Sequence, residues 1–407
     1  MTFLDLIIFT RMGRLKEMMI DQENGLMHTF DGDKKVCAEH FRDPYLQDYI
    51  RKNGHEGLCS YCGKEHTLVL DMQDFMQHVE ERLSQRLCSL DDANLPLSSS
   101  YYDDDKEVIP GVRRAGSFIL PEKAETYEDV QDLMDSYGLY TLNNDLNEDI
   151  ASCFNNDECV QTEAFAEDLD EELSYEWDYF SNMVKHKKRY TFFQDPHFIR
   201  KEEWKDDVLT EINQLCGNIL MSKLTKGTLI FRGRPNDIGV PRTSFKDLTA
   251  PPTEAAKENR MSAAGISMFY GALDKDTPIH EIRNYTPDAV IDLGEFELKR
   301  ELVVVDLFKI PKDLSFWMPK YFWEYKFLKK FHSEITQPIG KNPSIDYVPT
   351  QIFTEYIRFM NNYHIDGIIY QSSMTGEKNI VLFYDNNTSA EVLQLNKVKT
   401  YQYDKIG

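Results

Sequence analysis

The stretch ISMFYGALDKDTPIHEIRNY, residues 266–285, predicts a strand, a polar turn and a helix in immediate succession. The apolar run ends at Tyr270 and Gly271, and Pro278 lies where a helix would begin. Proline is favoured in the first helical turn because its missing N–H would have no helical partner there. Glu281 follows in that turn, eleven residues after Tyr270. A carboxylate near a helix N-terminus is favourable in itself, so the stretch alone leaves the purpose of Glu281 open.

Short strands and helices surround this stretch. Beyond Lys226 and Gly227 the strand-like segments are TLIFRG, GISMFYGA, AVIDLGEF, ELVVVDLF, DGIIYQS and NIVLFYD. Helical spacing interrupts them at 278–285, 320–332 and 350–362. Strands mixed with scattered helices are typical of an α+β domain. We therefore expect the fold class α+β, with a mixed β-sheet domain after a mainly helical N-terminal region.

Periodicity divides the chain into four expected regions. Helical spacing runs through 12–30 and 67–90 and returns in 201–220, whereas it weakens between 91 and 172. The expected regions are a helical region at 12–90, an acidic, partly flexible linker at 91–172, a helical connector at 173–221 and the α+β domain at 222–400. Residues 1–11 are interpreted as an upstream extension.

The negative charge is concentrated in one segment. The 407 residues carry a formal net charge of −23, and residues 89–180 contribute 25 acidic but only 4 basic side chains. An acidic chain repels phosphate backbones, which argues against a nucleic-acid partner. The nearly balanced remainder can still form a basic pocket for a small anion. We hypothesise that the acidic segment shields this pocket until a partner protein moves it.

Membrane insertion and secretion are not expected. No apolar run reaches the roughly 18 residues that a membrane-spanning helix needs. The opening MTFLDLIIFTRMGR lacks the basic front end of a signal peptide. Seven cysteines, an odd number without a secretory signal, indicate a reducing compartment. We expect a cytoplasmic protein with no membrane contact.

Two short ligand pairs near the N-terminus are typical of a zinc site. Cys37 and His40 form a C-x-x-H pair, and Cys59 and Cys62 form a C-x-x-C pair eighteen residues further on. Tetrahedral zinc takes four such ligands, and a site with four protein ligands has no open position for catalysis. The spacing therefore predicts a structural zinc knuckle. The alternative is a set of free thiols beside unrelated surface histidines.

Four polar features accompany the C-terminal strands. Arg232 and Arg234 end the strand LIFRGRP, and Arg260 precedes Tyr270 by ten residues. Ser372 opens a turn after the strand GIIYQ. Each feature has an ordinary explanation: arginines at a strand end form surface ion pairs, and serines are common turn residues. Their order along the chain is more informative than any one of them.

The order of arginine, tyrosine, glutamate and serine resembles the RES family, which is named for its arginine, glutamate and serine. The matching segments are FRGR, NRMSAAGISMFYGA, IHEIR and IIYQSS followed by NIVLF, within residues 225–395. The segments at 12–90 and 174–195 are similar to the zinc-containing HEPN/RES N-terminal domain. Glu258-Asn259-Arg260-Met261 replaces the usual Gly-Gly-Arg-Trp, and Gln371 stands where proline is common.

The resemblance implies an ADP-ribosyltransferase-like fold that consumes NAD. It assigns the catalytic roles to Arg232, Tyr270, Glu281 and Ser372, with Arg260 as a further NAD-binding residue. The arginines would hold the pyrophosphate, and Tyr270 and Ser372 would orient the ribose. Glu281 would stabilise the positive charge that develops when nicotinamide leaves. Arg232 is preferred over Arg234 because it directly follows an aromatic residue, as in the family.

The function expected from the resemblance is cleavage of the nicotinamide–ribose bond of NAD, by hydrolysis or phosphorolysis, in a toxin or a stress or defence effector. An antitoxin or regulatory protein is the expected partner, and a homodimer is the expected assembly. The alternatives are transfer of ADP-ribose to a protein and a catalytically silent, zinc-containing module that binds a partner. His280, next to Glu281, is the weaker candidate for a general base.

Overall fold

The computed structural model describes residues 26–93, 95–97, 112–115, 117–127, 129–155, 158–162, 168–195, 207–236, 239–318, 320–337, 342–359 and 364–402. Most of the helix expected at 12–30 therefore lies outside the described residues. The chain forms two compact units. The N-terminal unit comprises Met1–Glu167 and Asp313–Phe322, and the C-terminal unit comprises Asp168–Lys312 and Trp323–Gly407.

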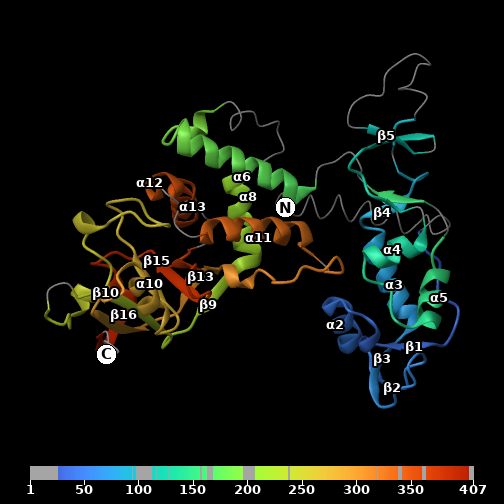
Figure 1. The fold of residues 1–407 in the computed structure, drawn as a ribbon, viewed down its shortest axis with the longest axis horizontal. Helices are drawn as coiled ribbons and strands as arrows, with labels where there is room; N and C mark the ends of the chain where they lie inside the picture. The colour runs from blue at the N-terminus through green and yellow to red at the C-terminus, as the bar shows by residue number, and fades with distance from the viewer. Residues whose placement is uncertain are drawn as a thin grey trace. The chain divides into compact units, whose positions relative to one another are not determined.

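The C-terminal unit is built on an eight-stranded sheet with the order β16-β12-β10-β11-β15-β14-β13-β9 (Figure 1). Its strands are β9 (Met221–Leu224), β10 (Leu229–Pro235), β11 (Phe269–Ala272), β12 (Ile291–Leu298), β13 (Leu302–Asp306), β14 (Gly367–Gln371), β15 (Lys378–Leu382) and β16 (Leu393–Tyr401). Strands β13 and β14 pair in parallel and the other neighbours are antiparallel. The expected α+β class with a mixed sheet is confirmed.

Helices cover this sheet. They are α6 (Leu169–His186), α8 (Val208–Leu215), α9 (Phe245–Leu248), α10 (Thr277–Tyr285), α11 (Phe322–Thr336), α12 (Pro343–Asp346), α13 (Val348–Phe359) and α14 (Ser389–Val392). A π-helical turn, Cys216–Leu220, follows α8, and single 3₁₀ turns lie at Phe192–Gln194, Thr253–Ala255 and Leu307–Lys309.

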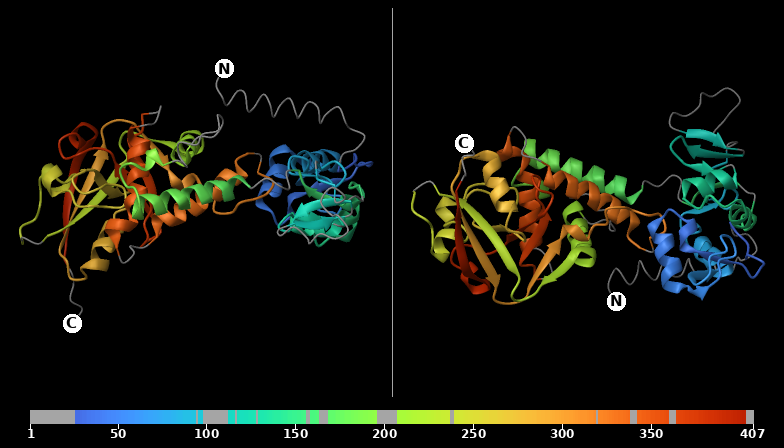
Figure 2. Two further views of the ribbon diagram at one scale, coloured as in Figure 1. Left: turned by 90° about the horizontal axis from the view of Figure 1, so that it is seen from above. Right: turned by 60° about the horizontal axis from the view of Figure 1, so that its bottom comes forward.

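Helices α6 and α11 run side by side (Figure 2) and are joined by polar and aromatic contacts. The indole N–H of Trp177 donates to Glu334, and the Trp177 ring meets Phe331 edge-on with the ring centres 4.8 Å apart. The Phe331 ring also meets the Phe353 ring of α13 edge-on. These aromatic side chains belong to a core that also contains Ile368 of the sheet. The helices thereby give the sheet a rigid backing.

Helix α10 begins where the sequence predicts, and the side chain of Asp274 fixes the backbone at its N-terminus. Asp274 Oδ1 accepts hydrogen bonds from the backbone N–H groups of Asp276, at 3.0 Å, and Thr277, at 2.8 Å. These bonds satisfy donors that a helix start leaves free. The helix then packs closely on β10, because a Cβ atom at Gly233 would lie 2.8 Å from Ile282 Cδ1. Glycine at this position lets α10 approach the sheet.

The N-terminal unit combines small sheets with short helices. One sheet has the order β1-β3-β2, another the order β4-β8-β7, and β5 pairs with β6. The strands are β1 (Lys35–Cys37), β2 (His55–Gly57), β3 (Thr67–Asp71), β4 (Leu87–Ser89), β5 (Val112–Ala115), β6 (Phe118–Pro121), β7 (Thr126–Tyr127) and β8 (Cys159–Gln161). The helices are α2 (Pro44–Asn53), α3 (Met72–Leu83), α4 (Val130–Ser136) and α5 (Asn144–Ser152), with a 3₁₀ turn at Ala38–His40.

The described part of the acidic segment 91–172 contains regular structure. It includes β5 to β8, α4 and α5. Leu133 and Ile150 from these helices are buried in the same core as Phe75 of α3. Short elements present only a few apolar positions each, so their periodicity is weak although their side chains are buried.

The segment Asp313–Phe322 belongs to the N-terminal unit although the sequence around it forms the C-terminal unit. Trp317 is almost fully buried, and its indole N–H donates to the carbonyl of Tyr137 at 2.9 Å. The guanidinium of Arg86 lies 4.4 Å from the ring centre of Phe316 and 4.5 Å from that of Phe322. These contacts anchor the segment by aromatic burial and cation–π attraction.

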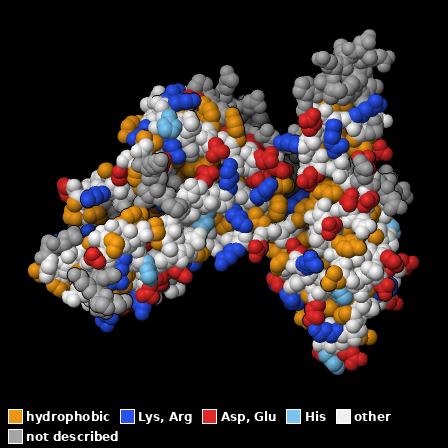
Figure 3. Space-filling model, viewed as in Figure 1, with side chains coloured by type: hydrophobic (Ala, Val, Ile, Leu, Met, Phe, Trp, Pro, Cys, Tyr) orange, Lys and Arg blue, Asp and Glu red, His pale blue; other side chains and the backbone are white. Residues whose placement is uncertain are grey.

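The surface mixes charges of both signs. On the visible face of the described residues, Lys and Arg side chains are interspersed with Asp and Glu side chains (Figure 3). Among the described residues, no helix combines the length and apolar character needed to cross a membrane.

Replacing Trp317 by alanine is expected to reduce the free energy of unfolding of the N-terminal unit by about 3–5 kcal/mol, because a buried indole leaves a cavity when it is removed. Leu142→Ala is the control, since that side chain is 93% exposed. Urea unfolding followed by circular dichroism measures both variants. Identical transitions for the two variants would show that Trp317 does not anchor the segment.

Candidate functional site

The sequence-predicted residues Arg232, Tyr270, Glu281 and Ser372 come from adjoining elements of the C-terminal unit. Arg232 lies on β10, Tyr270 on β11 and Glu281 on α10, while Ser372 directly follows β14. In the sheet, β10 neighbours β11, and β15 lies between β11 and β14. The chain therefore brings these positions to one region although up to 140 residues separate them.

The carboxylate of Glu281 is held at one oxygen. The Ser372 hydroxyl donates to Glu281 Oε1 at 2.6 Å, and the Asn379 amide donates to the same oxygen at 2.7 Å. Ser372 and Asn379 are buried, and Glu281 is half-buried. Two donors on one carboxylate oxygen fix the orientation of the side chain.

The turn after β14 is fastened to the start of α10. Thr277 Oγ1 of the helix lies 2.8 Å from Thr375 Oγ1 of the turn, and Thr277 is fully buried. Within the turn, the N–H of Gly376 donates to the Ser372 carbonyl at 2.9 Å. The Ser372 hydroxyl gives its single proton to Glu281. That hydrogen bond orients the carboxylate.

Arg232 is a cation with incomplete hydrogen bonding. Its Nη1 donates to the carbonyl of Tyr270, while its buried Nε has no hydrogen-bond partner among the described residues. The guanidinium carbon lies 5.4 Å from the ring centre of Phe269. Burial, followed by repulsion from Arg234, lowers the pKa of Arg232 to about 9. The group thus stays cationic at neutral pH, in surroundings that favour an incoming anion.

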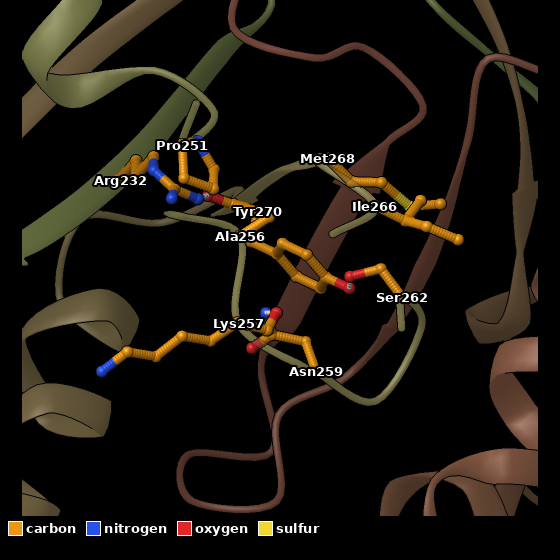
Figure 4. A pocket seen from close by; sticks show the side chains of 9 residues that line it. All are labelled: Arg232, Pro251, Ala256, Lys257, Asn259, Ser262, Ile266, Met268 and Tyr270. Carbon is orange, nitrogen blue, oxygen red and sulfur yellow. Dashed lines mark hydrogen bonds between the residues drawn. The ribbon is translucent and has the colours of Figure 1, made fainter. Parts of the chain in front are cut away.

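A pocket of about 90 Å³ lies against Arg232 and Tyr270. Its lining is Arg232, Pro251, Ala256, Lys257, Asn259, Ser262, Ile266, Met268 and Tyr270 (Figure 4). The Tyr270 ring crosses it, and the hydroxyl lies 2.9 Å from Ser262 Oγ. Burial raises the pKa of Tyr270, so its side chain is a neutral phenol. The pocket lining therefore includes two cationic residues, Arg232 and Lys257, and the neutral polar groups of Asn259, Ser262 and Tyr270.

The other two arginines have main-chain partners elsewhere. Arg234 Nη2 donates to the Thr249 carbonyl at 2.7 Å. Arg260 Nη1 donates to the Ile335 carbonyl at 2.6 Å, and its Nη2 donates to the Gln337 carbonyl. Arg260 thus binds carbonyls at the end of α11, and it is not part of the pocket lining. The second expected cation for pyrophosphate is committed to the fold in this structure.

Asn379 and Tyr370 are site residues that the sequence reasoning did not assign. They are register partners on β15 and β14. Burial raises the pKa of Tyr370 well above its ordinary value, and the charges of Tyr270 and Glu281 raise it further. Asn379 carried a signal, because a polar residue at the head of the apolar strand NIVLF points to a buried partner. His280 is exposed on α10.

The expected zinc ligands gather in the N-terminal unit. The ligand atoms of Cys37, His40, Cys59 and Cys62 all lie within 4.8 Å of one another. Cys37 Sγ is 3.7 Å from Cys62 Sγ, and His40 Nε2 is 3.4 Å from Cys59 Sγ. Ligands about 2.3 Å (sulfur) and 2.0–2.1 Å (nitrogen) from a tetrahedral zinc have separations of this size. The four groups therefore fit a tetrahedral metal ion.

The two buried thiols of this cluster differ in acidity. Burial raises the pKa of Cys37 to about 12. Burial also opposes ionisation of Cys59, but hydrogen bonds from the backbone N–H groups of Cys62, Tyr61 and Cys37 outweigh it and lower its pKa. Thiolate is the metal-binding form, and the backbone N–H groups around Cys59 favour that form.

Comparison with known proteins finds two domains along the chain. Residues 52–198 match the family HEPN/RES N-terminal domain 1, and residues 235–404 match the RES domain. No curated protein matches the chain. Among solved structures, it is similar to a chain in the crystal structure of the M. tuberculosis MbcT–MbcA toxin–antitoxin complex, with 12% identity and a TM-score of 0.32 over 47% of this chain and 92% of that one. The protein belongs to the RES-domain family and carries a HEPN/RES N-terminal domain 1 ahead of its RES domain.

Proposed function

We propose that this protein degrades NAD by cleaving the bond between nicotinamide and ribose, and that it acts as a toxin or defence effector. The observation that carries the proposal is the carboxylate of Glu281, which two neutral donors hold in place. The same unit contains the guanidinium of Arg232, whose Nε has no hydrogen-bond partner among the described residues. Tyr370 interacts electrostatically with both charged groups. NAD cleavage requires an anion for the ribose and a cation for the diphosphate.

The proposed reaction begins with the departure of nicotinamide. The bond between ribose C1′ and the nicotinamide nitrogen breaks, its electron pair leaves with nicotinamide, and positive charge develops on the ribose. Glu281 stabilises this charge because its carboxylate is already oriented and is not neutralised by an ion pair within the described part of the chain. Water or inorganic phosphate then forms the new bond to C1′.

Binding of the diphosphate is assigned to Arg232. A buried guanidinium with a free N–H is costly, and a bound anion would offset that cost by charge and hydrogen bonding. Tyr270 and Ser262 would contribute neutral hydroxyl groups from the pocket. Arg260 would act indirectly, through its contacts with the end of α11.

The cellular context is carried over from the family. An antitoxin or regulatory protein would restrain the activity, and the protein would act in the cytoplasm, where NAD is available. Transfer of ADP-ribose to a protein is the second candidate, since the same cleavage produces the same electrophilic ribose. The two reactions differ in the final acceptor of the ribose.

Glu281→Gln is expected to reduce NAD turnover at least a hundredfold, about 3 kcal/mol in the barrier, because the neutral amide no longer stabilises the ribose cation. Glu297→Gln, on β12, is the matched control. Purified variants are incubated with NAD, and nicotinamide and ADP-ribose products are quantified. Absence of NAD loss with the wild-type protein contradicts the proposal, and label that accumulates on protein supports the transferase instead.

Arg232→Lys is expected to raise the KM for NAD at least tenfold, about 1.4 kcal/mol, while leaving the melting temperature nearly unchanged. A lysine keeps the charge but loses the forked donor geometry. Arg260→Lys is the comparison and is expected to lower the melting temperature more than it raises KM, because its donors bind main-chain carbonyls. The reverse pattern would assign the diphosphate to Arg260.

We further propose that Cys37, His40, Cys59 and Cys62 hold a structural zinc ion. The double variant Cys59→Ser, Cys62→Ser is expected to lose bound zinc, and its N-terminal unit is expected to melt at a lower temperature. Cys88→Ser is the control, because Cys88 is outside the cluster. Elemental analysis of the purified proteins measures the metal directly. Full zinc content in the double variant would refute the assignment.

A further inference from the structure

Asn379 has a polar side chain that the proposed mechanism does not yet use. It lies on β15, is 6% exposed, and donates its amide to Glu281 Oε1 at 2.7 Å. Its backbone is held on both sides, by pairing with Ala272 of β11 and Tyr370 of β14. A side chain that starts from the middle of three paired strands has little freedom to follow a moving partner. The position of the Asn379 amide is therefore fixed by the sheet, and the Glu281 side chain takes the conformation that reaches it.

The orientation of the amide follows from chemistry. An ionised carboxylate only accepts hydrogen bonds, so the N–H₂ end of Asn379 must face Glu281. The Ser372 hydroxyl reaches the same oxygen from the turn after β14. Both donors thus occupy Oε1, and the other carboxylate oxygen, Oε2, has no hydrogen-bond partner among the described residues. The arrangement divides the carboxylate into an anchored oxygen and an available one.

Neutral donors hold Glu281, whereas cations hold two other carboxylates of the C-terminal unit. Asp306 pairs with Lys378 at 3.2 Å, and Asp366 pairs with Arg300 at 3.1 Å. Cations neutralise those two groups. No ion pair of Glu281 occurs in the described part of the chain, so its negative charge remains available to act on a ligand.

We propose that Asn379 is a positioning residue that, together with Ser372, anchors Oε1 of Glu281 and reserves Oε2 for the ribose of the substrate. The inference rests on the proposed function, because it assigns the use of the free oxygen to NAD cleavage. Without the amide, only the hydroxyl of Ser372 would hold the carboxylate. Glu281 would then rotate among staggered conformers, and only some of them direct Oε2 at the ribose.

Asn379→Ala tests the anchoring. We expect kcat for NAD cleavage to fall ten- to a hundredfold, whereas KM changes less than about threefold, because the interaction serves the transition state rather than ground-state binding. Thermal unfolding is measured in parallel. A kcat equal to that of the wild type contradicts the inference, and so does a loss of kcat that appears only above a lowered melting temperature.

Asn379→Asp tests the polarity of the contact with almost no change of shape. Two carboxylates at this distance share a proton, so the carboxylate pair needs a higher pH to become fully ionised. We expect the acidic limb of the kcat–pH profile to move upward by at least about one pH unit. Tyr370, the ionisable group of β14 that interacts with Glu281, is unchanged in this variant.

The matched control is Asn396→Asp. Asn396 Nδ2 donates to Glu297 Oε2, also at 2.7 Å, but this pair is exposed on β16 and β12. The control creates the same pair of carboxylates away from the pocket, and we expect its pH profile to match the wild type. Equal shifts in both variants overturn the inference. Loss of the proposed function is recognised separately, because the wild-type protein would then fail to consume NAD.

Discussion

The anchoring of one carboxylate oxygen is the constraint on which the arrangement of the site depends. Glu281 comes from α10, whereas its two donors come from β15 and from the turn after β14. Helix α10 can supply the carboxylate only because Gly233 permits close approach to β10 and Thr277 meets Thr375 in the turn after β14. Four elements must therefore be in place before the carboxylate is oriented, which is how a fold pre-organises a charge.

The site keeps its two charges unneutralised. Arg232 and Glu281 could neutralise each other in an ion pair. In the structure, Arg232 instead bonds a backbone carbonyl, and Glu281 bonds a hydroxyl and an amide. The neutral phenols of Tyr270 and Tyr370 interact with these charges without cancelling them. Such a site costs folding free energy, as functional sites commonly do. Under the proposed function, a dinucleotide with an anionic diphosphate and a ribose that becomes cationic would offset both costs at once.

Sequence reasoning predicted the elements well where periodicity is strong. Strands β10 to β15 and the start of α10 were expected from apolar runs and Pro278, whereas the two edge strands β9 and β16 were not. The proximity of Glu281 and Ser372 was expected from the resemblance to the RES family. Asn379 was missed because its role depends on cross-strand register, which one sequence does not reveal. The short helices between 129 and 153 carry a weak sequence signal because few of their positions are apolar, although those few are buried.

The position of Arg260 explains how an arginine can serve the pocket without lining it. Its neighbours Asn259 and Ser262 do line the pocket, and Gln351 of α13 donates to the carbonyls of both. Thr350 of α13 donates to the Arg260 carbonyl, while the Arg260 side chain binds the end of α11. Hydrogen bonds to α11 and α13 therefore hold the part of the pocket wall formed by residues 259–262. A guanidinium in this place sets the position of the wall, and a substitution there would act on the substrate through the main chain rather than through charge.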